Sequence, residues 1–238
     1  MKTKAIIFDK DGTLIDFDTF WVGVSVNALS EVLAHLEIHD VPIDELLETL
    51  GVHDGVTDID GALCKGTYAQ IGRLVYDVLC RYGYGFDCDK VTELVIEAYN
   101  KNSDSGEVKP TCSDLSDVLL RLKSQNIKLA VVTVDNETIT RKCLKKLGIE
   151  ELFDKIYTDD GITPPKPDPY CAIDFAKSVG VGLENLVMVG DTMTDIKFAQ
   201  NAGIKVIGVS KSDKNKEKLS PYAEAVISEL SVLSDILE

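Results

Sequence analysis

Two acidic residues lie two positions apart near the start of the chain, in the stretch KAIIFDKDGTLID. Asp9 and Asp11 directly follow an apolar, β-branched run. Side chains alternate along a strand, so both acids share one side while the chain stays extended, and Lys10 points the other way. Gly12 then permits a sharp turn. Carboxylates this close repel each other unless a cation neutralises them, so the spacing indicates a cation site.

Two further apolar runs end in polar side chains. IKLAVVT ends in Thr133, and NLVMVGD ends in Asp191, with Asp195 four residues later. Lys166 lies in PPKPDP, just upstream of the second run. Because the carboxyl ends of parallel strands meet at one edge of a sheet, we expect these side chains to gather there. Carboxylate oxygens suit Mg²⁺, which together with Lys166 would make a positive site shaped for a phosphate group.

The elements that must position these residues follow a regular alternation. Short β-rich runs are each followed by apolar residues at helical spacing, and several helical patterns end in glycine, at Gly148, Gly180 and Gly203. Apolar strands alternating with helices indicate an α/β fold with a doubly wound parallel sheet. The expected strands are 4–9, 127–133, 185–191, 204–210 and 223–228.

The segment after the first strand breaks this alternation. Apolar residues recur there at helical spacing in three successive stretches, with no convincing strand between them. The polar segment NKNSDSGEVKP follows before the alternation resumes. We therefore expect an inserted α-helical domain at 16–108, and an α/β core built from 1–15 and 109–238.

Charge and cysteine usage limit the partners and the compartment. The formal net charge is −15, from 40 acidic and 25 basic residues, and such a field repels nucleic acid and anionic membranes. The 6 cysteines include no C-x-x-C pair, which favours reduced thiols. The apolar run AIIF is too short for a signal peptide, and no stretch is long enough to span a bilayer. We expect a cytoplasmic protein.

The motifs FDKDGT, a strand-ending Thr133, Lys166 in a KP context and GDTMTD occur in this order along the chain. Together they resemble the haloacid dehalogenase (HAD) superfamily. The helical insert is similar to that of the branch with an α-helical cap, which contains phosphoglycolate phosphatases and β-phosphoglucomutase. The resemblance covers nearly the whole chain. It implies a Rossmann-like core and a Mg²⁺-dependent phosphatase that hydrolyses a small phosphomonoester, with phosphoglycolate as the default substrate.

The resemblance also implies a role for each catalytic residue. Asp9 would be the nucleophile and would form an aspartyl-phosphate. Asp11 would protonate the departing alkoxide and then deprotonate the attacking water. Thr133 and the backbone amide of Val134 would hold the phosphoryl oxygens. Lys166 would offset charge on both the nucleophile and the phosphate.

For the metal, the resemblance implies a Mg²⁺ ion held by the Asp9 carboxylate, the main-chain carbonyl of Asp11 and the Asp191 carboxylate. Asp195 would lie behind these ligands and orient Asp191 or a bound water, although it could instead cap the helix that follows. Lys10 stands where leucine is commoner, and we expect it to be structural or to support the ligands from behind.

Caps of this family usually supply the residues that select the substrate. In CKGTYAQIGR, glycines that could bring a loop close to the active site accompany four polar side chains. The alternative is an ordinary solvated helix face. The candidate specificity residues are Lys65, Thr67, Tyr68 and Arg73.

Other functions share parts of this pattern. A phosphomutase of the β-phosphoglucomutase type has every core motif and differs only in the acceptor of the phosphoryl group, so this alternative stays open. A dehalogenase has no use for Mg²⁺ or for an acid at Asp11. A signalling receiver module is about half this length and lacks a helical insert. The expected partner is a small phosphorylated metabolite, and the sequence leaves open a monomer or a homodimer.

Overall fold

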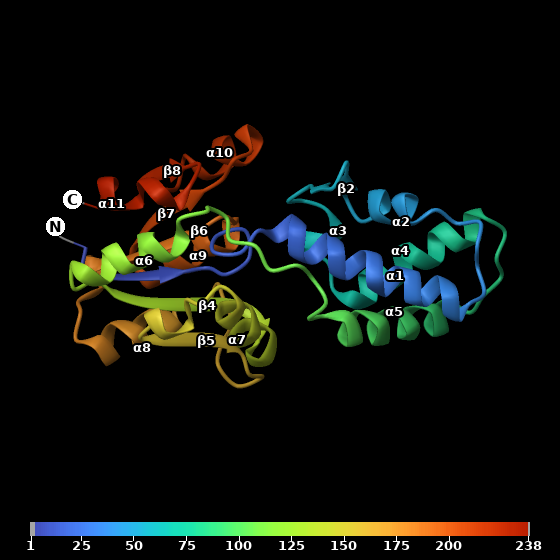
Figure 1. Cartoon of the computed structure of the whole chain (residues 1–238), viewed down its shortest axis with the longest axis horizontal. Helices are drawn as coiled ribbons and strands as arrows, with labels where there is room; N and C mark the ends of the chain where they lie inside the picture. Colours follow the sequence, from blue (N-terminus) through green and yellow to red (C-terminus); the bar gives the residue numbers. More distant parts are fainter. Residues whose placement is uncertain (1–2, 238) are drawn as a thin grey trace. The chain divides into compact units, whose positions relative to one another are not determined.

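A six-stranded sheet lies at the centre of the larger of two compact units in the computed structural model, which describes residues 3–237 (Figure 1). All neighbouring strands in it are parallel, in the order β5-β4-β1-β6-β7-β8. The doubly wound order matches the predicted fold class. The strands are β1 (Ala5–Phe8), β4 (Lys128–Asn136), β5 (Lys155–Asp159), β6 (Leu186–Gly190), β7 (Lys205–Val209) and β8 (Ala225–Ile227).

β1 is the central strand that carries the first acidic motif. Each of its four residues is fully buried, as expected for a parallel strand covered on both faces. Phe8 pairs with Val131 of β4 on one side and with Val189 of β6 on the other. The carboxyl ends of β4, β1 and β6 therefore meet at one edge of the sheet.

Helices cover both faces of this sheet. On one face, Ile7, Ala130 and Met188 from three strands form a core cluster with residues of α8 and α9, among them Phe175 and Phe198. α6 packs on β4 and contacts α11. The helices of this unit are α6 (Leu115–Ser124), α7 (Glu137–Lys146), α8 (Tyr170–Val179), α9 (Met193–Ala202), α10 (Asp213–Leu219) and α11 (Leu233–Ile236).

The second unit spans Phe17–Glu107, whereas the first runs through Asp16 and resumes at Val108. The second unit is mainly helical. A π-helical turn at Asp18–Val22 leads into its first helix. Its helices are α1 (Gly23–His35), α2 (Ile43–Thr49), α3 (Ala62–Lys65), α4 (Tyr68–Arg81) and α5 (Cys88–Asn102).

Two features differ from the sequence-based expectation. β5 was not predicted, and it forms an edge strand whose residues are mostly half-buried. The helical unit also contains an antiparallel hairpin of β2 (Val52–His53) and β3 (Val56–Thr57). Asp54 and Gly55 both have positive φ, the conformation of a two-residue hairpin turn. The DG pair in the sequence is a signal for such a turn, which the prediction of an all-helical unit did not include.

No helix within residues 3–237 is long and apolar enough to cross a membrane. All six cysteines are free thiols.

Candidate active site

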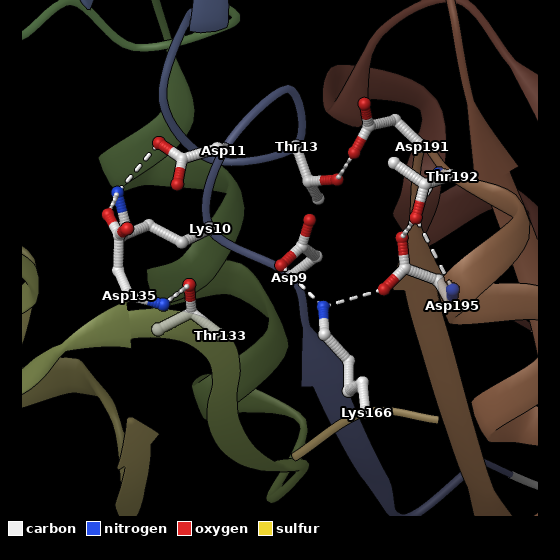
Figure 2. A network of polar contacts seen from close by, with 10 residues as sticks. All are labelled: Asp9, Lys10, Asp11, Thr13, Thr133, Asp135, Lys166, Asp191, Thr192 and Asp195. Atoms are coloured by element: carbon white, nitrogen blue, oxygen red, sulfur yellow. Dashed lines mark hydrogen bonds and ion pairs between the residues drawn. The ribbon is translucent and has the colours of Figure 1, made fainter. Parts of the chain in front are cut away.

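Asp9 and Lys166 form a buried ion pair at the carboxyl edge of the sheet (Figure 2). Lys166 Nζ lies 2.6 Å from Asp9 Oδ1 and 2.7 Å from Asp195 Oδ1. Asp195 also belongs to the N-terminal capping box of α9, where its Oδ2 accepts from the Thr192 backbone amide at 3.0 Å. Asp195 therefore uses one carboxylate oxygen to cap the helix and the other to hold Lys166.

Asp191 is the third carboxylate of this edge, and neighbouring side chains fix its position. The Thr13 hydroxyl donates to Asp191 Oδ1 at 3.1 Å, and Asn215 Nδ2 donates to the Asp191 main-chain carbonyl at 2.9 Å. Gly12 has φ +77°, and a Cβ placed on it would lie 2.2 Å from Asp191 Oδ2. The turn after β1 therefore approaches Asp191 so closely that any side chain at position 12 would displace the Asp191 carboxylate.

The three carboxylates form a group that fits a hard divalent cation. Ligand oxygens of Asp9, Asp191 and Asp195 all lie within 4.8 Å of one another. Lys166 offsets one negative charge of the group, so two remain when all three acids are ionised. A divalent ion would cancel that remainder, and all-oxygen carboxylate sites suit Mg²⁺.

Burial and mutual repulsion shift the pKa values of this group. Burial raises the pKa of Asp9 to about 6, although the Lys166 ammonium opposes the rise. The pKa of Asp191 is raised well above its usual range by burial and then by the charges of Asp9 and Asp195. For Lys166, burial lowers the pKa, but Asp195 and Asp9 outweigh it and the pKa is raised. Lys166 therefore stays charged. A further positive charge beside Asp9 and Asp191 would favour their ionised forms.

This environment predicts a pH-dependent stability in EDTA. The pKa of Asp9 rises from 3.8 to about 6 on folding, so the folded state binds more protons between these values. This stabilisation of the folded state is fully present below pH 3.8 and is lost as the pH rises through about 6. The measurement is the free energy of unfolding in urea, for wild type and for Asp9→Asn. Relative to the variant, wild type should gain about 1 kcal/mol of stability when the pH falls from about 7 to about 5, and about 3 kcal/mol at the acid limit. A difference that does not change with pH would contradict this assignment.

A second polar group, formed around Lys10, lies on the side of Asp9 away from Asp191 and Asp195 (Figure 2). Lys10 Nζ is 2.6 Å from Asp11 Oδ1 and 2.8 Å from Asp135 Oδ2. The backbone amide of Asp135 donates to the Thr133 hydroxyl at 3.2 Å. The Asp11 carboxylate thus turns toward Lys10, because β1 ends at Phe8 and the chain after it no longer alternates as a strand does.

β4 leaves its regular pairing where Thr133 lies. The register between β4 and β5 is irregular between Val132 and Asn136, a disruption common beside active sites. Thr133 is buried, and its hydroxyl can still donate while it accepts from Asp135. Val134 is 57% exposed. This segment can therefore present a hydroxyl and a backbone amide to an anion.

The haloacid dehalogenase-like hydrolase family matches residues 6–209 of the chain. The chain belongs to this family. The resemblance predicted from its four motifs is confirmed, and this family member is an enzyme of the hydrolase class.

Two relatives match this member of the hydrolase family over most of its length. The phosphoglycolate phosphatase of Psychrobacter arcticus is 27% identical over 210 residues, which cover 88% of this chain and 84% of the relative. The pyrophosphatase PpaX of Bacillus velezensis is 27% identical over 236 residues, covering 99% and 95%. A solved HAD-superfamily hydrolase, subfamily IA, from Geobacter sulfurreducens shares the fold with a TM-score of 0.70, 16% identity and coverage of 99% and 97%.

The four candidate specificity residues of this hydrolase lie in its helical unit. Lys65 and Arg73 line a hollow of about 440 Å³, and Lys65 also pairs with Asp60 there. Thr67 caps α4 through a capping box. The ring of Tyr68 packs against that of Tyr99, with centroids 5.0 Å apart. Two of the four therefore face a space that could receive a ligand, and the other two have structural contacts.

Three residues that support the candidate site of this hydrolase have little signal in the sequence. Thr13 follows the first motif as part of DGT, so its proximity to Asp191 could have been suspected. Asn215 lies in the charged stretch KSDKNKEK, which favours a solvated segment, yet it is buried. Asp135 opens the polar stretch DNET that follows Thr133 and Val134, and nothing in its spacing points to Lys10.

Proposed function

We propose that this protein is a Mg²⁺-dependent phosphatase that hydrolyses a small phosphomonoester through an aspartyl-phosphate on Asp9. The observation that carries the proposal is the position of Asp9 within 2.6 Å of the Lys166 ammonium and among three carboxylates at the carboxyl edge of the sheet. Phosphoryl transfer depends mainly on positioning and charge neutralisation, and this arrangement supplies both. The names of the two relatives agree with chemistry on phosphate compounds.

In the first step, an Asp9 carboxylate oxygen attacks the substrate phosphorus and the bond from phosphorus to the ester oxygen breaks. Lys166 keeps Asp9 ionised and offsets the charge of the incoming phosphoryl group. Asp11, which enters this step in its protonated form, donates its proton to the departing oxygen and becomes a carboxylate. Thr133 and the amide of Val134 hold the phosphoryl oxygens.

In the second step, Asp11 takes a proton from a water molecule that attacks phosphorus. The bond from phosphorus to Asp9 then breaks, which releases inorganic phosphate and restores the Asp9 carboxylate. Asp195 holds Lys166 in place throughout through its 2.7 Å contact. The covalent route divides one difficult hydrolysis into two easier steps.

The residues that would hold Mg²⁺ are Asp9, Asp191 and the main-chain carbonyl of Asp11. When bound, the ion would neutralise negative charge on the phosphoryl group and on the acids around it. We place the activity in the cytoplasm, where the six free thiols stay reduced. The enzyme would act as a monomer or a homodimer.

The test is a survey of phosphate release from 2-phosphoglycolate, glycerol 3-phosphate, pyrophosphate and β-glucose 1-phosphate, with Mg²⁺ and with EDTA. We expect steady phosphate release that requires Mg²⁺. Pyrophosphate is included because the Bacillus velezensis relative is a pyrophosphatase. Conversion of β-glucose 1-phosphate to glucose 6-phosphate without phosphate release would favour the phosphomutase. No turnover of any compound would reject the proposal.

We also infer that the helical unit, as a cap, helps to select the substrate through Lys65 and Arg73. The Arg73→Ala variant should raise KM for an anionic substrate about 3- to 10-fold and leave kcat within about twofold, because it removes binding shared by ground state and transition state. Arg81→Ala is a matched control on the same helix, since Arg81 pairs with Glu45 and lies outside the hollow. Equal KM values for all three proteins would contradict the inference.

A further inference from the structure

Lys10 is a fully buried lysine placed between two carboxylates. Its side chain is 0% exposed, and its ammonium contacts Asp11 at 2.6 Å and Asp135 at 2.8 Å. Lysine is rarely buried completely unless it is paired, because removing the charge from water is costly. An apolar side chain could fill the same space at less cost, so the charge at this position calls for an explanation beyond packing.

The contacts of Lys10 join two parts of the site (Figure 2). Asp11 follows β1, whereas Asp135 lies near the end of β4. The backbone amide of Asp135 donates to the Thr133 hydroxyl, so the same short segment also carries the residue proposed to bind the phosphoryl group. Lys10 therefore ties the Asp11 carboxylate to the segment that surrounds Thr133.

We propose that Lys10 is a positioning residue that holds the Asp11 carboxyl group, protonated for the first step, so that it can transfer its proton to the leaving group, with Asp135 as the anchor of Lys10. This inference rests on the proposed function. A general acid must lie within hydrogen-bonding reach of the oxygen that it protonates, and small displacements of such groups lower rates strongly. The Asp11 side chain follows the end of a strand and is partly exposed, and its ion pair with Lys10 restricts its position.

The proposal predicts an effect that depends on the leaving group. In the first step, the bond between phosphorus and the ester oxygen breaks as Asp9 bonds to phosphorus, and the oxygen of an alkyl ester needs the proton of Asp11. The nitrophenolate of p-nitrophenyl phosphate leaves without one. A residue that positions the acid should therefore matter for alkyl esters and little for the nitrophenyl ester, whereas general damage to the fold would slow both.

The experiment measures leaving-group release in a single turnover with Mg²⁺. The substrates are p-nitrophenyl phosphate and either glycerol 3-phosphate or 2-phosphoglycolate, whichever wild type hydrolyses faster. We expect Lys10→Met to slow the alkyl ester by about 10- to 100-fold and the nitrophenyl ester by less than about threefold. Asp11→Asn should show the same selectivity, and the double variant should be no slower than Asp11→Asn alone. Equal slowing of both esters, or additive losses in the double variant, would overturn the proposal.

Asp135→Asn provides a second variant that leaves both Lys10 and Asp11 in place. Asp135→Asn should lower the ratio of the alkyl-ester rate to the nitrophenyl-ester rate by about threefold or more. An unchanged ratio in this variant would overturn the proposal, even if Lys10→Met does not fold. Lys128→Met is the control. Lys128 lies at the amino end of β4 and pairs with Asp154, so the ratio of the alkyl to the nitrophenyl rate in this variant should equal that of wild type. An inactive wild type would reject the proposed function itself, whereas an active wild type with unchanged ratios in the variants would reject only the role of Lys10.

Discussion

Asp9→Asn is expected to lower kcat for phosphate release by at least about 10⁴-fold, since loss of a nucleophile removes the covalent route entirely. The amide is nearly the same size as the carboxylate, so the substitution creates no cavity. Burial already raises the pKa of Asp9 to about 6, which means that its charge disfavours folding at neutral pH without a metal. The variant should therefore fold, with a melting temperature in EDTA equal to or above that of wild type.

Asp213→Asn is the matched control for this experiment. It makes the same chemical change at a side chain that is 94% exposed, and it should leave kcat unaltered. The measurement is initial phosphate release under saturating substrate and Mg²⁺, with thermal unfolding as the check on folding. An Asp9→Asn enzyme that retains more than about one hundredth of wild-type kcat would remove Asp9 from the mechanism.

Gly12→Ala is expected to lower kcat/KM by at least about 100-fold, for a different reason. Its φ of +77° is strained for alanine, which costs about 1–2 kcal/mol of stability. The added Cβ would also lie 2.2 Å from Asp191 Oδ2, so the Asp191 carboxylate must move out of its present position. A displaced ligand should raise the Mg²⁺ concentration needed for half-maximal activity as well.

Gly180→Ala separates the two effects. Gly180 closes α8 with φ +68°, and a Cβ placed there meets nothing within 4 Å. This control carries the same backbone strain without the clash at Asp191. It should lose similar stability in urea unfolding and keep wild-type activity. Equal activity losses in both variants would mean that backbone strain alone explains the result at Gly12.

Most of the sheet could be predicted from the sequence because β1 and β6 are fully buried and β4 and β7 are largely buried. β1 and β6 are continuous apolar runs, the pattern of parallel strands covered on both faces. β5 has mostly half-buried residues at the sheet edge, so its apolar signal was weak. The β2–β3 hairpin has two-residue strands, too short to interrupt a helical pattern, and only its DG turn indicated it.

The ends of the strands explain why part of the site could be predicted. Asp9, Thr133 and Asp191 are candidates because each follows an apolar run, and the strands that carry them, β1, β4 and β6, are neighbours in the sheet. Lys166 came from its motif context, since its loop carries no periodic signal. Lys166 nevertheless reaches Asp9, which is far away in the sequence.

The supporting contacts could not be predicted in the same way. Strand alternation placed Lys10 away from both acids, but the chain turns after Phe8 and its ammonium reaches Asp11. Asn215 contacts the Asp191 carbonyl from α10, and such a contact depends on how a helix packs rather than on local pattern. Side-chain contacts between distant segments require coordinates.

The most direct test of the central claim is chemical identification of the phosphorylated residue. Wild-type enzyme would be mixed with substrate and Mg²⁺, quenched in acid within one turnover, treated with borohydride and digested for mass spectrometry. Borohydride reduces an aspartyl-phosphate to homoserine, so the account predicts homoserine at position 9 and at no other aspartate. Efficient turnover with an unmodified Asp9, or with the label at another residue, would contradict it.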